Sequence, residues 1–140
     1  MLGPDTTPRS GAAPVVPERK ISETIVDFGA PLLSDLNEQQ PIELKRAALQ
    51  IVITVWNAHV MAMPVWGKPE LLERLNELLA GPNTAPEMIR ACTQLSRRRL
   101  QQFANDPRAV AEWSLVSEGP DQLRFRCDGR VPPCLMPRSA

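Results

Sequence analysis

The spacing of apolar residues changes near residue 108, and this change limits the folds that the chain can form. Before it, from about residue 22, apolar side chains recur every three or four positions, which is the repeat of an amphipathic helix. After it they alternate with polar side chains, as in a strand with one buried face. A chain of 140 residues is long enough for one domain and short for two. We therefore predict a single α+β domain over residues 19–131.

Four helical segments are predicted before the change. The first covers about residues 22–36 and contains Pro31, whose missing N–H predicts a kink or a break there. The other three cover about residues 41–63, 69–80 and 85–104. Because the segment 41–63 is apolar over most of its circumference, we expect it to be the central helix.

Two alternating segments follow, at about residues 110–117 and 122–131. The sequence Glu-Gly-Pro-Asp between them is typical of a turn, so the two segments predict an antiparallel β-hairpin. A hairpin on its own is marginally stable in water. Its apolar face is therefore expected to cover the helices, with Trp113, Leu115, Leu123 and Phe125 on that face.

Both ends of the chain lie outside the predicted domain. Residues 1–18 hold four prolines among small and polar residues and predict a disordered arm. Residues 132–140, with the sequence PPCLMPRSA, predict a second disordered tail.

The cellular compartment is inferred from features that the sequence lacks. No segment approaches the ~20 apolar residues that span a bilayer, and the N-terminus has no apolar core of signal-peptide length. Cys92, Cys127 and Cys134 are odd in number and have no spacing typical of zinc ligands. We expect a cytoplasmic protein with reduced thiols, no metal, no cofactor and no membrane contact.

Catalytic residue types are scarce. The chain has no tyrosine and one histidine, His59, which lies in the apolar arc of the predicted helix 41–63. Catalysis would need a partner such as a cysteine or a carboxylate, and no pattern supplies one. We favour a buried neutral histidine hydrogen-bonded to a backbone or side-chain group, and an enzyme site around His59 is the alternative.

The basic sequence Arg97-Arg98-Arg99 is open to two interpretations. On the predicted helix Arg99 falls among apolar residues, where its methylenes can line the core and its guanidinium can bridge Asp27 or Glu23. In that interpretation the cations also complement the dipole at the end of the helix.

The other interpretation is a nucleic-acid interface. Arg97 and Arg98, together with Arg124 and Arg126 on the exposed face of the hairpin, would contact phosphates. The formal net charge of zero argues against a generally basic nucleic-acid binder.

Our preferred function is a non-enzymatic module that binds a protein partner or a second copy of itself. The edges of a terminal hairpin are natural pairing surfaces. Charge is also uneven, with six basic and ten acidic side chains in residues 18–89 and eight basic and five acidic in residues 90–130. Trp66, in a loop beside Pro64 and Gly67, either anchors a partner or seals the corner between two helices. The candidate partner-binding residues are Trp66, Arg97, Arg98, Arg124 and Arg126.

Overall fold

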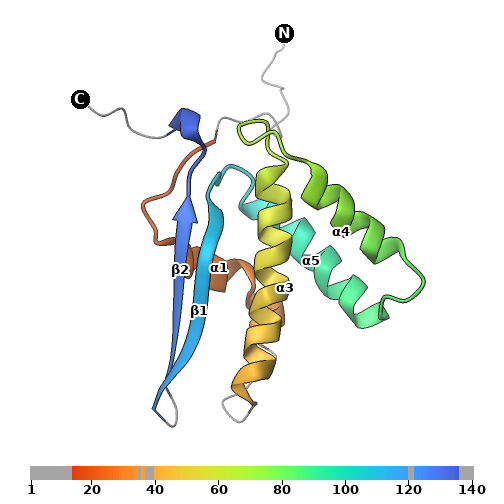
Figure 1. Ribbon diagram of the computed structural model, residues 1–140, viewed down its shortest axis with the longest axis vertical. Helices are drawn as coiled ribbons and strands as arrows, with labels where there is room; N and C mark the ends of the chain where they lie inside the picture. Colours follow the sequence, from red (N-terminus) through yellow and green to blue (C-terminus); the bar gives the residue numbers. More distant parts are fainter. Residues whose placement is uncertain (1–13, 35, 37–39, 120–121, 136–140) are drawn as a thin grey trace.

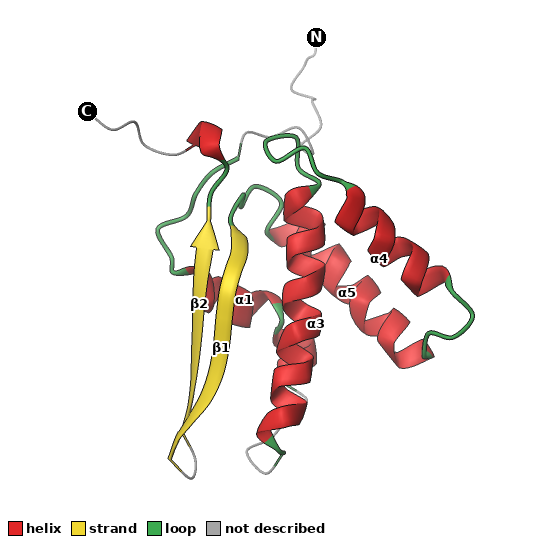
Figure 2. Ribbon diagram, viewed as in Figure 1, coloured by secondary structure: helices red, strands yellow, loops and turns green. Residues whose placement is uncertain are grey.

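Among the residues that the computed structural model of the chain describes, five helices precede a two-stranded antiparallel sheet (Figure 1), and a short 3-10 helix follows the sheet. The structure describes residues 14–34, 36, 40–119 and 122–135. Figure 2 shows that one long helix separates the hairpin from a pair of helices on its other side. The elements are α1 (Ile21–Phe28), α2 (Ala30–Leu33), α3 (Ile42–Met61), α4 (Glu70–Ala80), α5 (Pro86–Gln102), β1 (Ala109–Gly119), β2 (Gln122–Arg130) and η3 (Pro133–Leu135).

The predicted α+β order of helices followed by a hairpin is confirmed, and the first helix differs in detail. It consists of two helices, with Gly29 between them. The interruption lies two residues before Pro31, because a proline cannot donate to the carbonyl of Asp27. Leu32 N donates instead to Gly29 O at 3.0 Å. A Cβ at Gly29 would lie 2.7 Å from Cγ1 of Val52, so glycine allows this close approach to α3.

Helix α3 is the central element, as its wide apolar surface predicts. It packs against α1, α2, α4, α5 and β1. Beside it, the rings of Phe28, Trp56 and Phe103 meet edge to face, with centroids 5.1 to 5.8 Å apart. This aromatic cluster joins the N-terminal helix, the central helix and the end of α5 in one core.

A buried ion pair lies where α5 passes into β1. The side chains of Asp106 and Arg108 are 6% and 9% exposed, and Asp106 Oδ2 accepts from Arg108 Nη2 at 2.7 Å. The same guanidinium donates to Thr24 Oγ1 at 3.0 Å and to Arg19 O at 2.6 Å. Asp106 Oδ1 also accepts from the backbone N–H of Arg108. This network fixes the loop before the hairpin to the start of α1.

Arg99 is buried, as its position in the apolar arc predicts, but its partners are not the expected carboxylates. Its guanidinium lies over the Trp56 ring, 4.5 Å from the centroid. It donates to the carbonyl of Phe103 and, at 2.7 Å, to the carbonyl of Asp106. The expected bridge to Asp27 or Glu23 is wrong, because Arg99 is directed at the carbonyls that follow the end of its own helix.

The described parts of the predicted arm and tail contact the domain. Val15 N donates to Asn105 O at 2.8 Å. Pro132 is buried, and η3 follows it. Residues 1–13 and 136–140 of the predicted arm and tail lie outside the described residues.

The inner face of the hairpin covers the helices in part. Leu115 is buried, and Trp113 and Phe125 are half-buried with ring centroids 6.3 Å apart. Leu123, which was expected on the covered face, is 41% exposed near the turn. The hairpin therefore packs against α1 and α3, and its inner face is more exposed near the turn.

Candidate functional site

The outer edge of β1 is occupied by two polar side chains of α3. Asn57 donates its Nδ2 to Val110 O at 3.0 Å and accepts from Val110 N at 2.8 Å through Oδ1. Arg46 donates through Nε and Nη2 to Leu115 O at 3.1 and 2.9 Å. These bonds replace those that a neighbouring strand would make, so α3 closes this edge of the sheet.

The outer edge of β2 has no such cover. Val110 and Leu115 point their backbone groups away from β2, and their partners across the ladder are Gly129 and Phe125. The register shift between Val110 and Glu112 allows both to point this way although they are five residues apart. The backbone N–H and C=O groups of successive residues in a strand point alternately to its two sides. Two opposed residues either both point these groups toward each other or both point them away. Leu123, Phe125 and Cys127 therefore point their N–H and C=O groups away from β1. Among the described residues, no hydrogen bond from outside the sheet reaches the backbone groups of these three residues.

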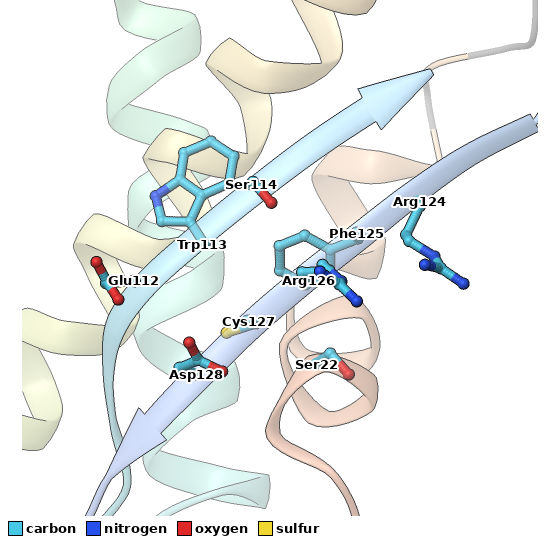
Figure 3. A pocket seen from close by; sticks show the side chains of 9 residues that line it. All are labelled: Ser22, Glu112, Trp113, Ser114, Arg124, Phe125, Arg126, Cys127 and Asp128. Carbon is cyan, nitrogen blue, oxygen red and sulfur yellow. The ribbon is translucent and has the colours of Figure 1, made fainter. Parts of the chain in front are cut away.

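A shallow, open depression of about 780 Å³ lies on the hairpin and reaches the N-terminal end of α1. Figure 3 shows its lining side chains, which come from both strands and from Ser22 of α1. The charged lining residues are Glu112, Arg124, Arg126 and Asp128. The depression is too open to enclose a small molecule, and its place beside β2 suits an extended chain.

Charges on the solvent face of the hairpin are segregated. Glu112 lies opposite Asp128 at the end near the loop from α5. Arg126 lies opposite Ser114, and Arg124 lies 3.4 Å from the carboxylate of Glu118. Arg126 forms no ion pair with any described residue. The half of β2 nearer the turn is therefore basic and exposed.

The structure separates the four arginines that were predicted as a joint interface. Arg124 and Arg126 share the exposed face of β2, whereas Arg97 and Arg98 are on α5, which packs mainly against α1, α2 and α3. Arg97 is exposed and Arg98 is partly buried. The four residues therefore do not form one continuous basic surface.

Arg98 has a structural partner at the end of α1. Its Nε donates to Phe28 O at 3.0 Å, and its Nη2 donates to Asp27 O at 2.7 Å. These are the carbonyls that the interruption at Gly29 and Pro31 deprives of helical donors. Arg98 thus caps α1 from a position 70 residues away in sequence.

Replacing Arg98 by alanine is expected to lower the free energy of unfolding by about 1–2 kcal/mol, because two carbonyls at the end of α1 lose a charged donor. The matched control is Arg97→Ala, which removes an exposed side chain and should change stability by less than about 0.5 kcal/mol. Urea unfolding of both variants measures the difference. Equal losses of unfolding free energy in the two variants would show that the hydrogen bonds of Arg98 to α1 do not stabilise the domain.

Trp66 is half-buried and packs against the core. Its Nε1 donates to Pro107 O at 2.7 Å, which ties the loop after α3 to the loop before β1. The geometry favours the interpretation that this side chain seals a corner of the domain. Its role as an anchor for a partner stays a prediction.

His59 is packed between α3 and α5. Its Nε2 lies 2.9 Å from Ser96 Oγ. Burial, with a smaller contribution from the charge of Arg99, lowers the pKa of His59 from 6.5 to about 4. The histidine is therefore neutral at pH 7, as the favoured interpretation expects, and it does not line the depression on the hairpin.

Stability should fall between pH 6.5 and pH 4 because of His59. In this range the unfolded chain binds a proton that the folded chain does not, which destabilises the folded state by roughly 1–3 kcal/mol at the acid end. Urea unfolding at pH 7 and pH 4, compared with that of His59→Gln, isolates this contribution. The variant should lose less stability than the wild type, and an identical loss would contradict the expectation.

The cysteines do not suggest a reactive centre. Cys92 is buried and Cys127 is half-buried, and burial is the main cause that raises the pKa of each thiol, to about 11 for Cys127. Cys134 is exposed. Within the described ranges, no group of three or more His, Cys, Asp or Glu side chains is placed to hold a metal ion.

Comparisons with known proteins do not assign the chain to a family. No family model, no curated protein and no solved structure matches the chain. In the part of the chain that the structure describes, every helix is too short or too polar to cross a membrane.

The sequence predicted the hairpin edges as pairing surfaces without separating one from the other. The signal that distinguishes them is the pair of polar residues on α3, Arg46 and Asn57, which lie on the narrow polar strip of that helix. Their use as partners for β1 depends on how α3 lies along the strand, and periodicity alone does not reveal this.

Proposed function

We propose that the protein binds other proteins by accepting an extended segment as a third strand beside β2. The observation that carries this proposal is the difference between the two edges. Asn57 and Arg46 occupy the backbone groups of β1, whereas those of Leu123, Phe125 and Cys127 have no such partner among the described residues. Strand addition uses such unpaired main-chain groups for affinity and the alternating side chains for specificity.

Other features of the chain agree with a binding role. The depression on the hairpin is open and is lined in part by residues of β2. His59, the one histidine, has a lowered pKa and a side-chain partner in the core. The histidine is thus used in packing, whereas the edge of β2 is available to a partner.

The test uses two variants at one position, Leu123→Pro and Leu123→Ala. Both remove the same exposed side chain, but only proline removes the outward N–H. Because no described residue accepts a hydrogen bond from that N–H, proline there is compatible with the existing ladder. Circular dichroism and thermal unfolding are used to check that both variants fold.

Wild type and variants are then compared for binding to peptides selected on wild type from an unbiased library of extended sequences. We expect Leu123→Ala to bind them nearly as well as wild type and Leu123→Pro to bind about tenfold more weakly, which corresponds to one hydrogen bond. Equal binding by the two variants, or a selection that enriches no peptide, would refute strand addition at β2.

A further inference from the structure

We infer that the segment accepted by β2 alternates acidic and apolar residues. This inference rests on the proposed function and adds the chemistry of the partner. It follows from the side chains that an added strand would meet on each face of the sheet. In the half of β2 nearer the turn, these are Arg124 and Arg126 on the solvent face, with Phe125 between them on the other face.

Arg124 and Arg126 determine which side chains fit the partner strand on the solvent face of the sheet. Residues directly opposite each other on neighbouring strands have Cβ atoms about 4.5–5.5 Å apart, and opposite charges there stabilise the pair. Arg124 and Arg126 are two residues apart on one face, so a partner with carboxylates at positions i and i+2 meets both. Arg126 has no ion pair with any described residue and Arg124 has one exposed pair, so both guanidinium groups are accessible.

The residue between the two carboxylates faces the other side of the sheet. There it lies beside Phe125, which is half-buried, and near Leu123, which is 41% exposed. An apolar side chain at this position covers surface that the helices leave open near the turn. The pattern acidic–apolar–acidic therefore fits both faces of the edge at once.

A second copy of the chain fits the basic half of this edge less well than an acidic strand does. In an antiparallel pair of β2 strands centred on Phe125, each Arg124 lies opposite the Arg126 of the other copy. A centre at Arg124 also places arginine opposite arginine, whereas centres at Arg126 and Cys127 place one arginine opposite another and a second arginine opposite Asp128. Like charges in such positions are destabilising, and charged edge residues are a common protection against self-pairing.

The experiment measures binding of synthetic seven-residue peptides to the full chain by fluorescence anisotropy at low and moderate salt. One peptide alternates glutamate with valine, a second has the same composition with its glutamates grouped together, and a third has lysine in place of glutamate. The protein variants are Arg124→Gln and Arg126→Gln, with Arg97→Gln as a control, because Arg97 is an exposed arginine on α5. Leu123→Pro and Leu123→Ala report on the backbone pairing.

We expect the alternating acidic peptide to bind at least tenfold more tightly than either of the other two. Its affinity should fall about tenfold in Arg126→Gln, somewhat less in Arg124→Gln, and not in Arg97→Gln. It should also fall as salt is raised. Sedimentation at micromolar concentration should show a monomer.

The possible failures are distinguishable. If lysine or grouped peptides bind as well as the alternating acidic peptide and remain sensitive to Leu123→Pro, the partner chemistry is wrong and strand addition stands. If the acidic peptide binds equally to Leu123→Pro and Leu123→Ala, strand addition itself is refuted. A dimer that Leu123→Pro dissociates would make a second copy the occupant and overturn this inference.

Discussion

Replacement of Asp106 by alanine is expected to lower the free energy of unfolding by roughly 3–5 kcal/mol. The substitution leaves the guanidinium of Arg108 buried without its carboxylate, and an uncompensated buried charge costs several kcal/mol. It also removes the acceptor of the Arg108 backbone N–H. Urea unfolding at pH 7 measures the loss.

The neighbouring substitution Asn105→Ala is the control. The Asn105 side chain is exposed, and the bond that this residue makes to Val15 uses its backbone carbonyl, so a change below about 0.5 kcal/mol is expected. The double variant Asp106→Ala/Arg108→Ala should be more stable than the sum of the single losses predicts, because the two side chains are direct partners. Additive losses would show that the ion pair is not the cause.

Replacement of Arg99 by methionine should lower the free energy of unfolding by roughly 2–5 kcal/mol. Methionine keeps much of the length that covers Trp56, but it cannot donate to the carbonyls of Phe103 and Asp106. Acceptors that stay buried without a donor cost about 1–3 kcal/mol each, and the loss of the desolvated charge offsets part of this. Arg90→Met, an exposed arginine on the same helix, should be nearly neutral.

The same variant gives a second readout through His59. The positive charge of Arg99 contributes to the low pKa of that histidine, so Arg99→Met should raise the His59 pKa above about 4. As the one histidine in the chain, His59 gives a single set of ring proton signals in an NMR titration. An unchanged pKa in a folded variant would contradict the placement of the guanidinium.

Periodicity was sufficient to predict the architecture of this chain. The apolar residues that follow the helical repeat of their own segments are buried, among them Ile25, Phe28, Val52 and Leu95. Trp113 and Leu115, which follow the alternation of a strand, are half-buried and buried. Such patterns report which face of an element is covered. The predicted break in the first helix was displaced by two residues, because the effect of Pro31 falls on carbonyls earlier in the chain.

The polar contacts between elements were not predictable in the same way. The sequence pattern predicted only that a helix ends near residue 104, whereas Asp106 just beyond it forms a buried pair with Arg108. Arg98 likewise has no local signal for its bonds to α1, since its partners are about 70 residues away. Such contacts are set by how the elements pack, which hydrophobic spacing does not encode. For the same reason the unequal edges of the hairpin emerged only with the position of α3.

The attachments of α1 bear on the order in which the chain can fold during synthesis. An isolated helix of eight residues is not stable in water, and here its end is capped by Arg98 while its first turn is bonded to Arg108. The ribosome makes α1 long before either arginine. The nascent N-terminal segment should therefore stay without stable helical structure until the loop before the hairpin has left the exit tunnel. Docking of α1 is thus expected to be a late step that completes the packing around the central helix.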